Sequence, residues 1–370
     1  MPMLAGLGAI GLVVVVVAGV LIVGLSGKSG GGNHLAQATF ATVAGPMATG
    51  RYWQTATLLQ DGRVLVAGGL DSAETPLASA ELYDPRTGTF SATGSMQQAR
   101  AWHTATLLSD DRVLIAGGLG GQGYLSSAEL YDPKTGAFTQ TGAMAYARRG
   151  HTATRLPDGR ILVAGGSTAS ATLDSAELYD PGTGRFSPDG LMFDRRAWAT
   201  ATSLPNGRVL IAGGAEGSTN LSTAELYDPE TDTFTQTGSM TVARRDCTAT
   251  LISGNRVLIA GGWIEESTGL DTAEIYDVAT GTFTATGTMA TVRWNQTATL
   301  LHDGRVLIVG GAADSTTEIY DPKTGEFSLT TADRTPRYAA TATLLSNGSV
   351  LIVGGFGSSE ATTAADLYRP

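Results

Sequence analysis

A pair of consecutive glycines returns along the chain at a nearly constant interval. The first glycine of each pair stands at Gly68, Gly117, Gly165, Gly213, Gly261, Gly310 and Gly354, so successive pairs lie 49, 48, 48, 48, 49 and 44 residues apart. A tyrosine follows every pair, and a phenylalanine follows six of these tyrosines by seven residues. A period of this length predicts small supersecondary units that bury apolar surface against their neighbours, and it argues against a single large core.

Each unit contains four segments that are typical of β-strands. In the second unit, residues 103–108 alternate in polarity and are rich in threonine, residues 112–118 contain a continuous apolar run, and residues 127–132 and 137–144 provide the third and fourth segments. Asp-Gly or Asn-Gly joins the first two segments in most units, which predicts a two-residue hairpin loop with both residues at positive φ. We therefore expect one four-stranded antiparallel sheet per unit.

The units resemble the kelch repeat. The likeness rests on the paired glycines, the Glu-Leu-Tyr-Asp of the third segment and the arginine before the first, and it covers residues 36–370. The fourth segment departs from the family because it carries phenylalanine where kelch units usually carry tryptophan. The resemblance implies an all-β, seven-bladed β-propeller of four-stranded antiparallel blades.

The last unit ends after its third segment, and an unpaired fourth segment stands near the N-terminus. We expect residues 37–47 to complete the blade built from residues 338–368 and thereby close the ring, since closure removes exposed sheet edges. Gly45 and Met47 match the spacing of the other units, whereas Phe40 lies one residue out of register. That offset predicts a β-bulge at Phe40.

Residues 3–25 form an uncharged apolar run, which is long enough to span a bilayer as one hydrophobic N-terminal helix. We divide the chain into residues 1–35, a membrane anchor or signal segment with a Gly/Ser linker, and residues 36–370, the propeller. The expected location is the cell membrane, with a single pass and the propeller outside the cytoplasm. Lys28 after the span favours the reverse orientation, and cleavage near Ala38 would instead give a secreted protein.

Variable loops join the second and third strands, and they share one mouth of the ring with the entries to the first strands. Variable loops on a rigid scaffold are where binding usually occurs. Aromatic residues gather at the same mouth, at Tyr52, Trp53, Trp102, Trp198, Trp263, Trp294 and Tyr338. They form either a platform for a glycan or peptide ligand or packing around the central channel.

Seven arginines also recur at this mouth, one at the entry to each first strand: Arg51, Arg100, Arg148, Arg196, Arg244, Arg293 and Arg337. As binding residues they would present planar forks of donors to an anion or carbonyl. As structural residues they would pair with the acid that recurs in every third strand. A group present in every unit favours the structural interpretation.

His103 and His151 occupy the same repeat position in adjacent units and are weak candidates for a metal site. Galactose oxidase has a kelch-type propeller, and that resemblance implies a copper site of His, Tyr and a Tyr–Cys crosslink. The adjacent Tyr-His pair of that family is missing, and the single cysteine is Cys247. We expect neither a cofactor nor a catalytic metal.

The charge of the chain argues against nucleic acid, since the net charge is −10 and lysines number three. Motifs of hydrolases and nucleotide-binding loops are missing from the sequence. We therefore predict a monomeric, membrane-tethered, kelch-type propeller that binds or scaffolds a protein, peptide or glycan. The alternative is a galactose-oxidase-like copper oxidoreductase.

Overall fold

The computed structural model describes residues 38–264, 268–333 and 335–370. The predicted hydrophobic helix at residues 3–25 and the linker that follows it lie outside this part of the chain. The described residues form strands, turns and loops without a helix, so none of them provides an apolar helix of membrane-spanning length.

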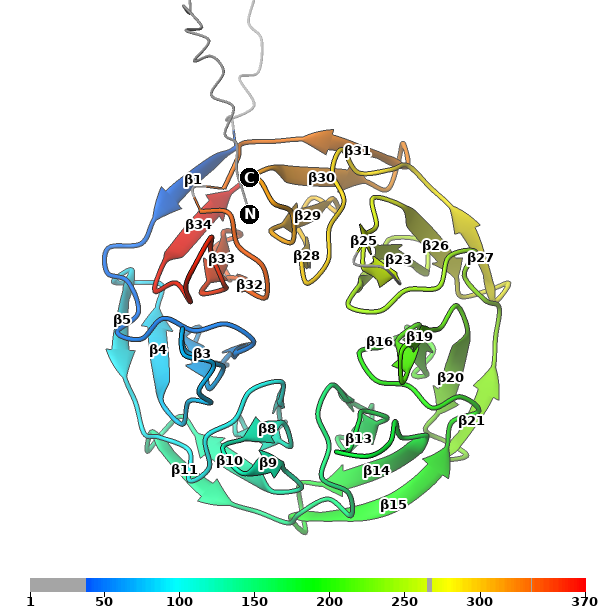
Figure 1. The fold of residues 1–370 in the computed structure, drawn as a ribbon, viewed down its shortest axis with the longest axis horizontal. Coiled ribbons are helices and arrows are strands. Elements are labelled where there is room, and N and C mark those ends of the chain that lie inside the picture. Colours follow the sequence, from blue (N-terminus) through cyan, green and yellow to red (C-terminus); the bar gives the residue numbers. More distant parts are fainter. Residues whose placement is uncertain (1–37, 265–267, 334) are drawn as a thin grey trace, which may run out of the picture. The chain divides into compact units, whose positions relative to one another are not determined.

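Seven four-stranded antiparallel sheets stand around a central axis, which confirms the predicted all-β, seven-bladed propeller (Figure 1). We number the blades 1–7 from the sheet that begins at Thr55. The innermost strands are β2 (Thr55–Leu58), β6 (Thr104–Leu107), β12 (Thr152–Arg155), β16 (Thr200–Ser203), β22 (Thr248–Ile252), β28 (Thr297–Leu300) and β32 (Thr341–Leu344). The second strands are β3 (Val64–Ala67), β7 (Val113–Ala116), β13 (Ile161–Ala164), β17 (Val209–Ala212), β23 (Arg256–Ala260), β29 (Val306–Val309) and β33 (Val350–Val353).

The outer half of each blade consists of the third and fourth strands. The third strands are β4 (Ala80–Asp84), β10 (Ala128–Asp132), β14 (Ser175–Asp180), β20 (Ala224–Asp228), β26 (Ala273–Asp277), β30 (Thr317–Asp321) and β34 (Ala365–Arg369). The outermost strands are β5 (Thr89–Ala92), β11 (Ala137–Gln140), β15 (Arg185–Leu191), β21 (Thr233–Gln236), β27 (Thr282–Ala285), β31 (Glu326–Leu329) and, in blade 7, β1 (Thr39–Thr42).

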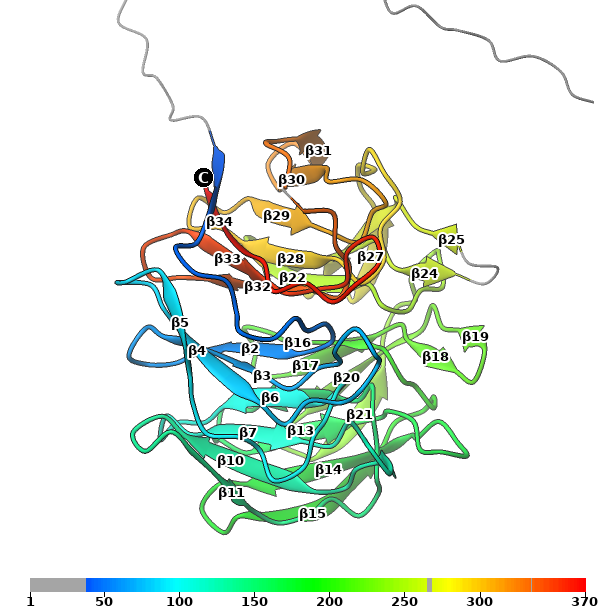
Figure 2. The same ribbon diagram turned by 60° about the vertical axis from the view of Figure 1, so that its left-hand side comes forward.

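Three short hairpins lie in the loops that join second to third strands. They are β8 (Leu119–Gly120) with β9 (Gly123–Tyr124), β18 (Ala215–Glu216) with β19 (Thr219–Asn220), and β24 (Trp263–Ile264) with β25 (Thr268–Gly269). Figure 2 shows β18–β19 and β24–β25 projecting from the same side of the ring. We call this side the variable mouth; it carries the entries to the innermost strands and the loops between second and third strands.

Strand β1 pairs antiparallel with β34, and the expected bulge at Phe40 is wrong. Phe40 lies opposite Tyr368 in an unbroken register, as Phe90 lies opposite Tyr83 in blade 1. The extra residue lies after the strand instead. The N–H of Ala44 donates to the carbonyl of the next blade's turn, the role that Gly94 plays in blade 1, so the additional residue is accommodated between residues 44 and 47.

The hairpins between first and second strands also differ from expectation. In blade 1, the N–H of Leu59 donates to the Arg63 carbonyl at 2.8 Å and the N–H of Gly62 donates to the Leu59 carbonyl at 3.0 Å, which leaves a three-residue loop. Gly62 has φ of 88°, whereas Asp61 is not left-handed. Asp61 instead accepts a hydrogen bond from the Arg63 N–H at 3.0 Å, so the aspartate stabilises the turn with its side chain.

The cores lie between blades rather than within them. In β3, Leu65 and Ala67 face the apolar cluster shared with blade 2, while Val64 and Val66 face the cluster shared with blade 7. This two-sided burial explains why second strands are continuously apolar. The recurring tyrosine and phenylalanine pack across neighbouring strands in every blade, with ring centroids about 5 Å apart.

Removing residues 36–47 should make the protein insoluble or markedly less stable, because the edge of β34 and the ring of Tyr368 would be exposed to solvent. We expect the melting temperature, measured by circular dichroism, to fall by at least about 5 °C. A deletion of residues 1–35, which leaves β1 in place, is the matched control. Equal melting temperatures for both truncations would contradict a role of β1 in closing the ring.

Candidate functional site

The seven repeated arginines are buried inside the blades, each at most 1% exposed. Arg148 shows the pattern: its Nη1 donates to the carbonyls of Gly165 at 2.9 Å and Ser175 at 3.0 Å, and its Nη2 donates to Oε1 of Glu177 at 2.7 Å. The other carboxylate oxygen of Glu177 accepts the backbone N–H of Ala145 at 2.8 Å. The pair therefore ties the chain entering a blade to that blade's second and third strands.

The same pairing recurs around the ring, with the acids Glu81, Glu129, Glu177, Glu225, Glu274, Glu318 and Asp366. Burial lowers the pKa of Arg148, and the charge and hydrogen bonds of Glu177 oppose that effect. The Nη donors of these guanidinium groups point at this chain's own carbonyls and carboxylates, whereas Nε of Arg51, Arg100, Arg148 and Arg196 is buried without a hydrogen-bond partner among the described residues. A ligand would reach the Nη donors only by displacing those partners, and all seven side chains are buried.

Two residues after each of these arginines, the chain forms a closed ring of backbone hydrogen bonds. Each N–H donates to the carbonyl of the equivalent residue in the preceding blade, over 2.8–3.5 Å, and the first blade donates to the last. All seven residues are left-handed, with φ between 51° and 60°. The ring positions are Trp53, Trp102, Gly150, Trp198, Asp246, Asn295 and Ala339.

Tryptophan is an unusual residue at these ring positions. Glycine, asparagine and aspartate tolerate positive φ, as at three of the other four positions, whereas a bulky side chain there is an outlier that costs of order 1 kcal/mol. The backbone ring does not require an indole, because blades 3, 5, 6 and 7 make the same hydrogen bonds without one. The backbone ring therefore does not explain the tryptophans at positions 53, 102 and 198. The contacts that their indole side chains make must explain them.

These indoles belong to an aromatic arc that crosses the mouth from blade 7 to blade 4. Trp53 and Trp102 stack with ring centroids 4.3 Å apart, and Trp102 meets Trp198 edge-on at 6.3 Å. Every indole in the arc is only partly buried, so each keeps some surface accessible to solvent. The members of the arc are Tyr338, Phe356, Tyr52, Trp53, Trp102 and Trp198.

Cationic side chains already lie on some of these rings. The guanidinium of Arg149 lies 4.7 Å from the ring centroid of Tyr124, 4.9 Å from that of Trp102 and 5.6 Å from that of Trp198. Trp263 and Trp294 form a separate edge-on pair at 5.3 Å. The sequence did not identify Arg149 or Tyr124 as site residues. Arg149 could have been found, because it occupies the same repeat position as Tyr52, Trp294 and Tyr338.

A polar cavity of about 270 Å³ lies at the centre of the ring positions. Its residues include Trp102, His151, Asp246 and Asn295. Burial raises the pKa of Asp246 to about 6, and the neighbouring Arg245 guanidinium, 3.7 Å away, opposes the rise. Asp246 thus changes charge near neutral pH.

The two histidines lie between blades and do not converge on a metal site. Nε2 of His103 is 3.0 Å from the hydroxyl of Thr55 in the preceding blade, and Nε2 of His151 is 3.0 Å from that of Thr104. Burial lowers the pKa of both imidazoles to about 3, so they are neutral. Gln54 and Gln296, at the same repeat position, also reach the preceding blade, where the side-chain amide of each donates to a backbone carbonyl.

Among residues 38–264, 268–333 and 335–370, the donors of a copper centre of the galactose oxidase kind are not assembled. Nε2 of both His103 and His151 lies within hydrogen-bond distance of a threonine hydroxyl. Burial raises the pKa of the Cys247 thiol to about 11, which disfavours the thiolate. Within the described part of the chain, no three His, Cys, Asp or Glu side chains gather closely enough to hold a metal ion. The described residues therefore do not fit such a group.

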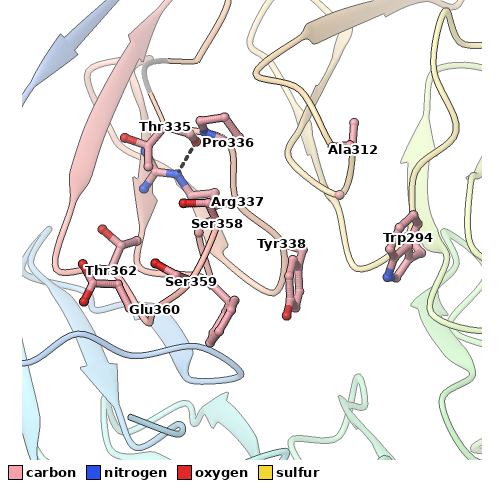
Figure 3. A pocket seen from close by; sticks show the side chains of 14 residues that line it. Trp294, Ala312, Thr335, Pro336, Arg337, Tyr338, Ser358, Ser359, Glu360 and Thr362 are labelled. Carbon is pink, nitrogen blue, oxygen red and sulfur yellow. Dashed lines mark hydrogen bonds between the residues drawn. The ribbon is translucent and has the colours of Figure 1, made fainter. Parts of the chain in front are cut away.

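A larger pocket, of about 470 Å³, lies at the same mouth between blades 6 and 7 (Figure 3). It opens where a loop is short: Gly310 and Tyr320 are 10 residues apart, whereas the equivalent separation is 14 or 15 in the other blades. Trp294, Tyr338 and Phe356 line the pocket with aromatic rings. The short interval of 44 residues between Gly310 and Gly354 was visible in the sequence, but it did not predict a pocket.

Comparison with known proteins agrees with this architecture. The kelch motif family matches the chain over residues 54–97, 103–145, 148–188, 200–241 and 244–290. No curated protein sequence matches it. Many solved structures do, among them a fungal alcohol oxidase of the AA5 family in complex with copper, with a TM-score of 0.73 and 20% identity over 90% of this chain and 76% of the oxidase.

Replacing Arg148 with methionine should strongly destabilise the protein, because Glu177 would keep a buried charge without its partner. We expect the free energy of unfolding, from urea titration, to fall by about 3–5 kcal/mol. The control is Arg86→Met, which removes an exposed pair with Asp84 and should leave stability unchanged. An Arg148→Met variant as stable as that control would refute a structural role for the buried arginine.

The variant Asp246→Asn should stabilise the protein above pH 6. The folded-state pKa is raised, so the stability that Asp246 contributes is present below its unfolded pKa and is lost as pH rises through about 6. Asparagine keeps the shape and tolerates positive φ, so we expect a gain of about 1–2 kcal/mol at pH 8 and little change near pH 4. Thermal melts across this range test it. A gain that is equal at both pH values would disprove the assignment.

Proposed function

Because the chain belongs to the kelch family of repeat proteins, we propose that its propeller is a binding or scaffolding module whose protein, peptide or glycan ligand contacts the variable mouth. One observation carries this proposal. Three tryptophans occupy left-handed ring positions where the backbone favours glycine or asparagine, and they bring their indoles together at the surface. Clustered, partly exposed indoles are typical of binding hot spots.

The construction of the mouth supports the same proposal. Buried Arg–acid pairs fix the backbone beneath the aromatic arc, and the ring of hydrogen bonds fixes its inner rim. A ligand that meets the arc would therefore find a preorganised surface, and little conformational entropy would be lost on binding. The loops between second and third strands differ in length and composition, so they would adjust specificity around a constant centre.

We further propose that residues 3–25 tether the propeller to the cell membrane as a single-pass anchor, with the propeller outside the cytoplasm. The length and apolar character of the segment support this proposal. The strand β1 begins at Thr39, so roughly a dozen residues rich in glycine and serine separate the apolar segment from the outermost strand of blade 7.

The test is a glycan and peptide array probed with the full-length chain and with the double variant Trp102→Asn, Trp198→Asn. Asparagine suits positive φ, as Asn295 does at the same ring position, so the backbone ring should persist while the aromatic surface is lost. We expect the wild type to bind a defined set of probes and the double variant to bind them at least about tenfold more weakly.

The matched control is Ala339→Gly, which changes a ring position without removing an aromatic ring. It should bind as the wild type does. Melting temperatures of all three proteins establish that they are folded. Array signals that are equal for wild type and double variant, or no probe bound by the wild type, would overturn the proposed function.

A further inference from the structure

The side chain of Arg149 at the variable mouth is held by aromatic rings of two other blades. Its guanidinium lies 4.7 Å from the ring centroid of Tyr124, 4.9 Å from that of Trp102 and 5.6 Å from that of Trp198. Tyr124 and Trp102 belong to blade 2 and Trp198 belongs to blade 4, whereas Arg149 lies at the entry to blade 3. A positive charge over a ring face is stabilised by the cation–π interaction. The blades on both sides therefore fix the position of this guanidinium.

The backbone at Arg149 is fixed as well. Its N–H donates to the carbonyl of Ser167 at 3.1 Å, and its carbonyl accepts the N–H of Ser167 at 2.9 Å. The next residue, Gly150, leaves room for Trp198, because a Cβ at Gly150 would lie 2.7 Å from Cδ2 of that indole. Little conformational freedom would thus be lost when a ligand meets the Arg149 side chain.

The hydrogen-bond donors of Arg149 have no partner in the part of the chain that the structure describes. Nε is buried without an acceptor, and neither Nη nitrogen donates to a described carbonyl, hydroxyl or carboxylate. Nε is also unpartnered in four of the seven repeated arginines, but their Nη atoms donate to carbonyls and carboxylates. A guanidinium carries five N–H donors in a planar fork, and in Arg149 the whole fork is unused.

Other arginines at the variable mouth have an acid beside them. Nε of Arg195 lies 3.5 Å from a carboxylate oxygen of Asp174, and Nε of Arg245 lies 3.7 Å from one of Asp246. Arg149 forms no such ion pair with a described residue. Aromatic rings attract its charge, but they do not replace the acceptors that its donors would have in water. The mouth therefore contains a fixed positive charge with unused donors.

The group that fits these donors is a carboxylate. Carboxylate and guanidinium are both planar and opposite in charge, so two parallel N–H···O bonds can form between them. One unpaired guanidinium also matches the single charge of a carboxylate, whereas a phosphate group carries more charge than one arginine neutralises. Because three rings flank the guanidinium, a carboxylate at the end of a methylene chain reaches it more easily than one attached directly to a sugar ring. Aspartate and glutamate side chains have that form.

We propose that Arg149 binds the carboxylate of an aspartate or glutamate side chain, presented at the variable mouth by a peptide or protein partner. The rings of Tyr124, Trp102 and Trp198 orient the guanidinium, and its fork donates hydrogen bonds to the incoming carboxylate. Trp102 and Trp198 are thus positioning residues as well as parts of the aromatic arc. The proposal rests on the proposed binding function and names its ligand class.

The experiment uses a positional library of immobilised, capped hexapeptides. The third residue is fixed as glutamate, aspartate, glutamine, asparagine or lysine, and the other positions are random mixtures of uncharged residues. We expect the glutamate or the aspartate mixture to retain at least about fivefold more full-length protein than the matching amide mixture, and the difference to shrink in about 1 M salt. Equal retention on acid and amide mixtures, strongest retention on lysine, or no retention at all would overturn the proposal.

Variants at Arg149 locate the carboxylate site. Arg149→Gln should abolish the preference for acid over amide, and Arg149→Lys should reduce it at least about twofold, because lysine keeps the charge but lacks the planar fork. The matched control is Arg195→Gln, which removes an exposed arginine at the same mouth and should leave the preference unchanged. Melting temperatures of all three should stay close to that of the wild type, since neither arginine forms a buried ion pair with a described residue. A preference that survives Arg149→Gln, or that Arg195→Gln reduces equally, would contradict the assignment.

The outcome is separable from that of the proposed function. If the array identifies a ligand that Trp102→Asn, Trp198→Asn weakens but Arg149→Gln does not, the binding function stands and the carboxylate site fails. If the acidic mixtures are retained and Arg149→Gln abolishes that retention, the carboxylate site stands whatever the array finds. Binding of an acidic oligosaccharide, with no retention on any acidic peptide mixture, would refute the assignment of a peptide ligand.

Discussion

The buried arginine–carboxylate pair is the interaction on which each blade depends. It joins three segments that are distant along the chain: the entry to the innermost strand, the paired glycines that end the second strand, and the third strand. Burying two charges is costly unless the surrounding groups satisfy them. Backbone carbonyls and N–H groups bind the Nη donors and the carboxylate here, whereas Nε of Arg148 is left without a hydrogen-bond partner. Because the pair recurs seven times, the entry to the innermost strand is held in the same way in every blade, although the side chains and the loops around it differ.

Within each repeat, the residues that maintain the fold and the residues that can vary occupy different positions. Residues that touch the arginine or fill the cores between blades are nearly invariant from one unit to the next, as the tyrosine–phenylalanine contact illustrates. Residues two positions after the arginine vary from tryptophan to glycine while their hydrogen bonds persist. A mouth of this kind can change its ligand through a few side chains without altering the ring. The aromatic arc on blades 7, 1, 2 and 4 and the pocket between blades 6 and 7 are two results of that freedom.

Most of the fold was predictable from the sequence, because the repeat period, the two-sided apolar strands and the turn residues all indicate the same blade. Local offsets were harder to place: Phe40 was expected in a bulge, yet the strand register is regular and the extra residue is accommodated before Met47. The sequence placed the aromatic residues at the variable mouth, but it did not predict which side chains contact them. Contacts such as Arg149 on Trp102 join different blades, and spacing along one unit says nothing about rotation between units. The pocket was missed for a related reason, since it is created by residues that are lacking in one loop.

The closed circle of backbone hydrogen bonds at the mouth has a topological consequence. A helix or an open strand pair has terminal groups without partners, and thermal fraying begins at those ends. The seven-membered circle has neither a first donor nor a last acceptor, since Trp53 donates to Ala339 just as each later member donates to its predecessor. Displacing any one of the seven residues breaks two backbone hydrogen bonds at once. Local unfolding of the inner rim therefore has no weak end at which to begin.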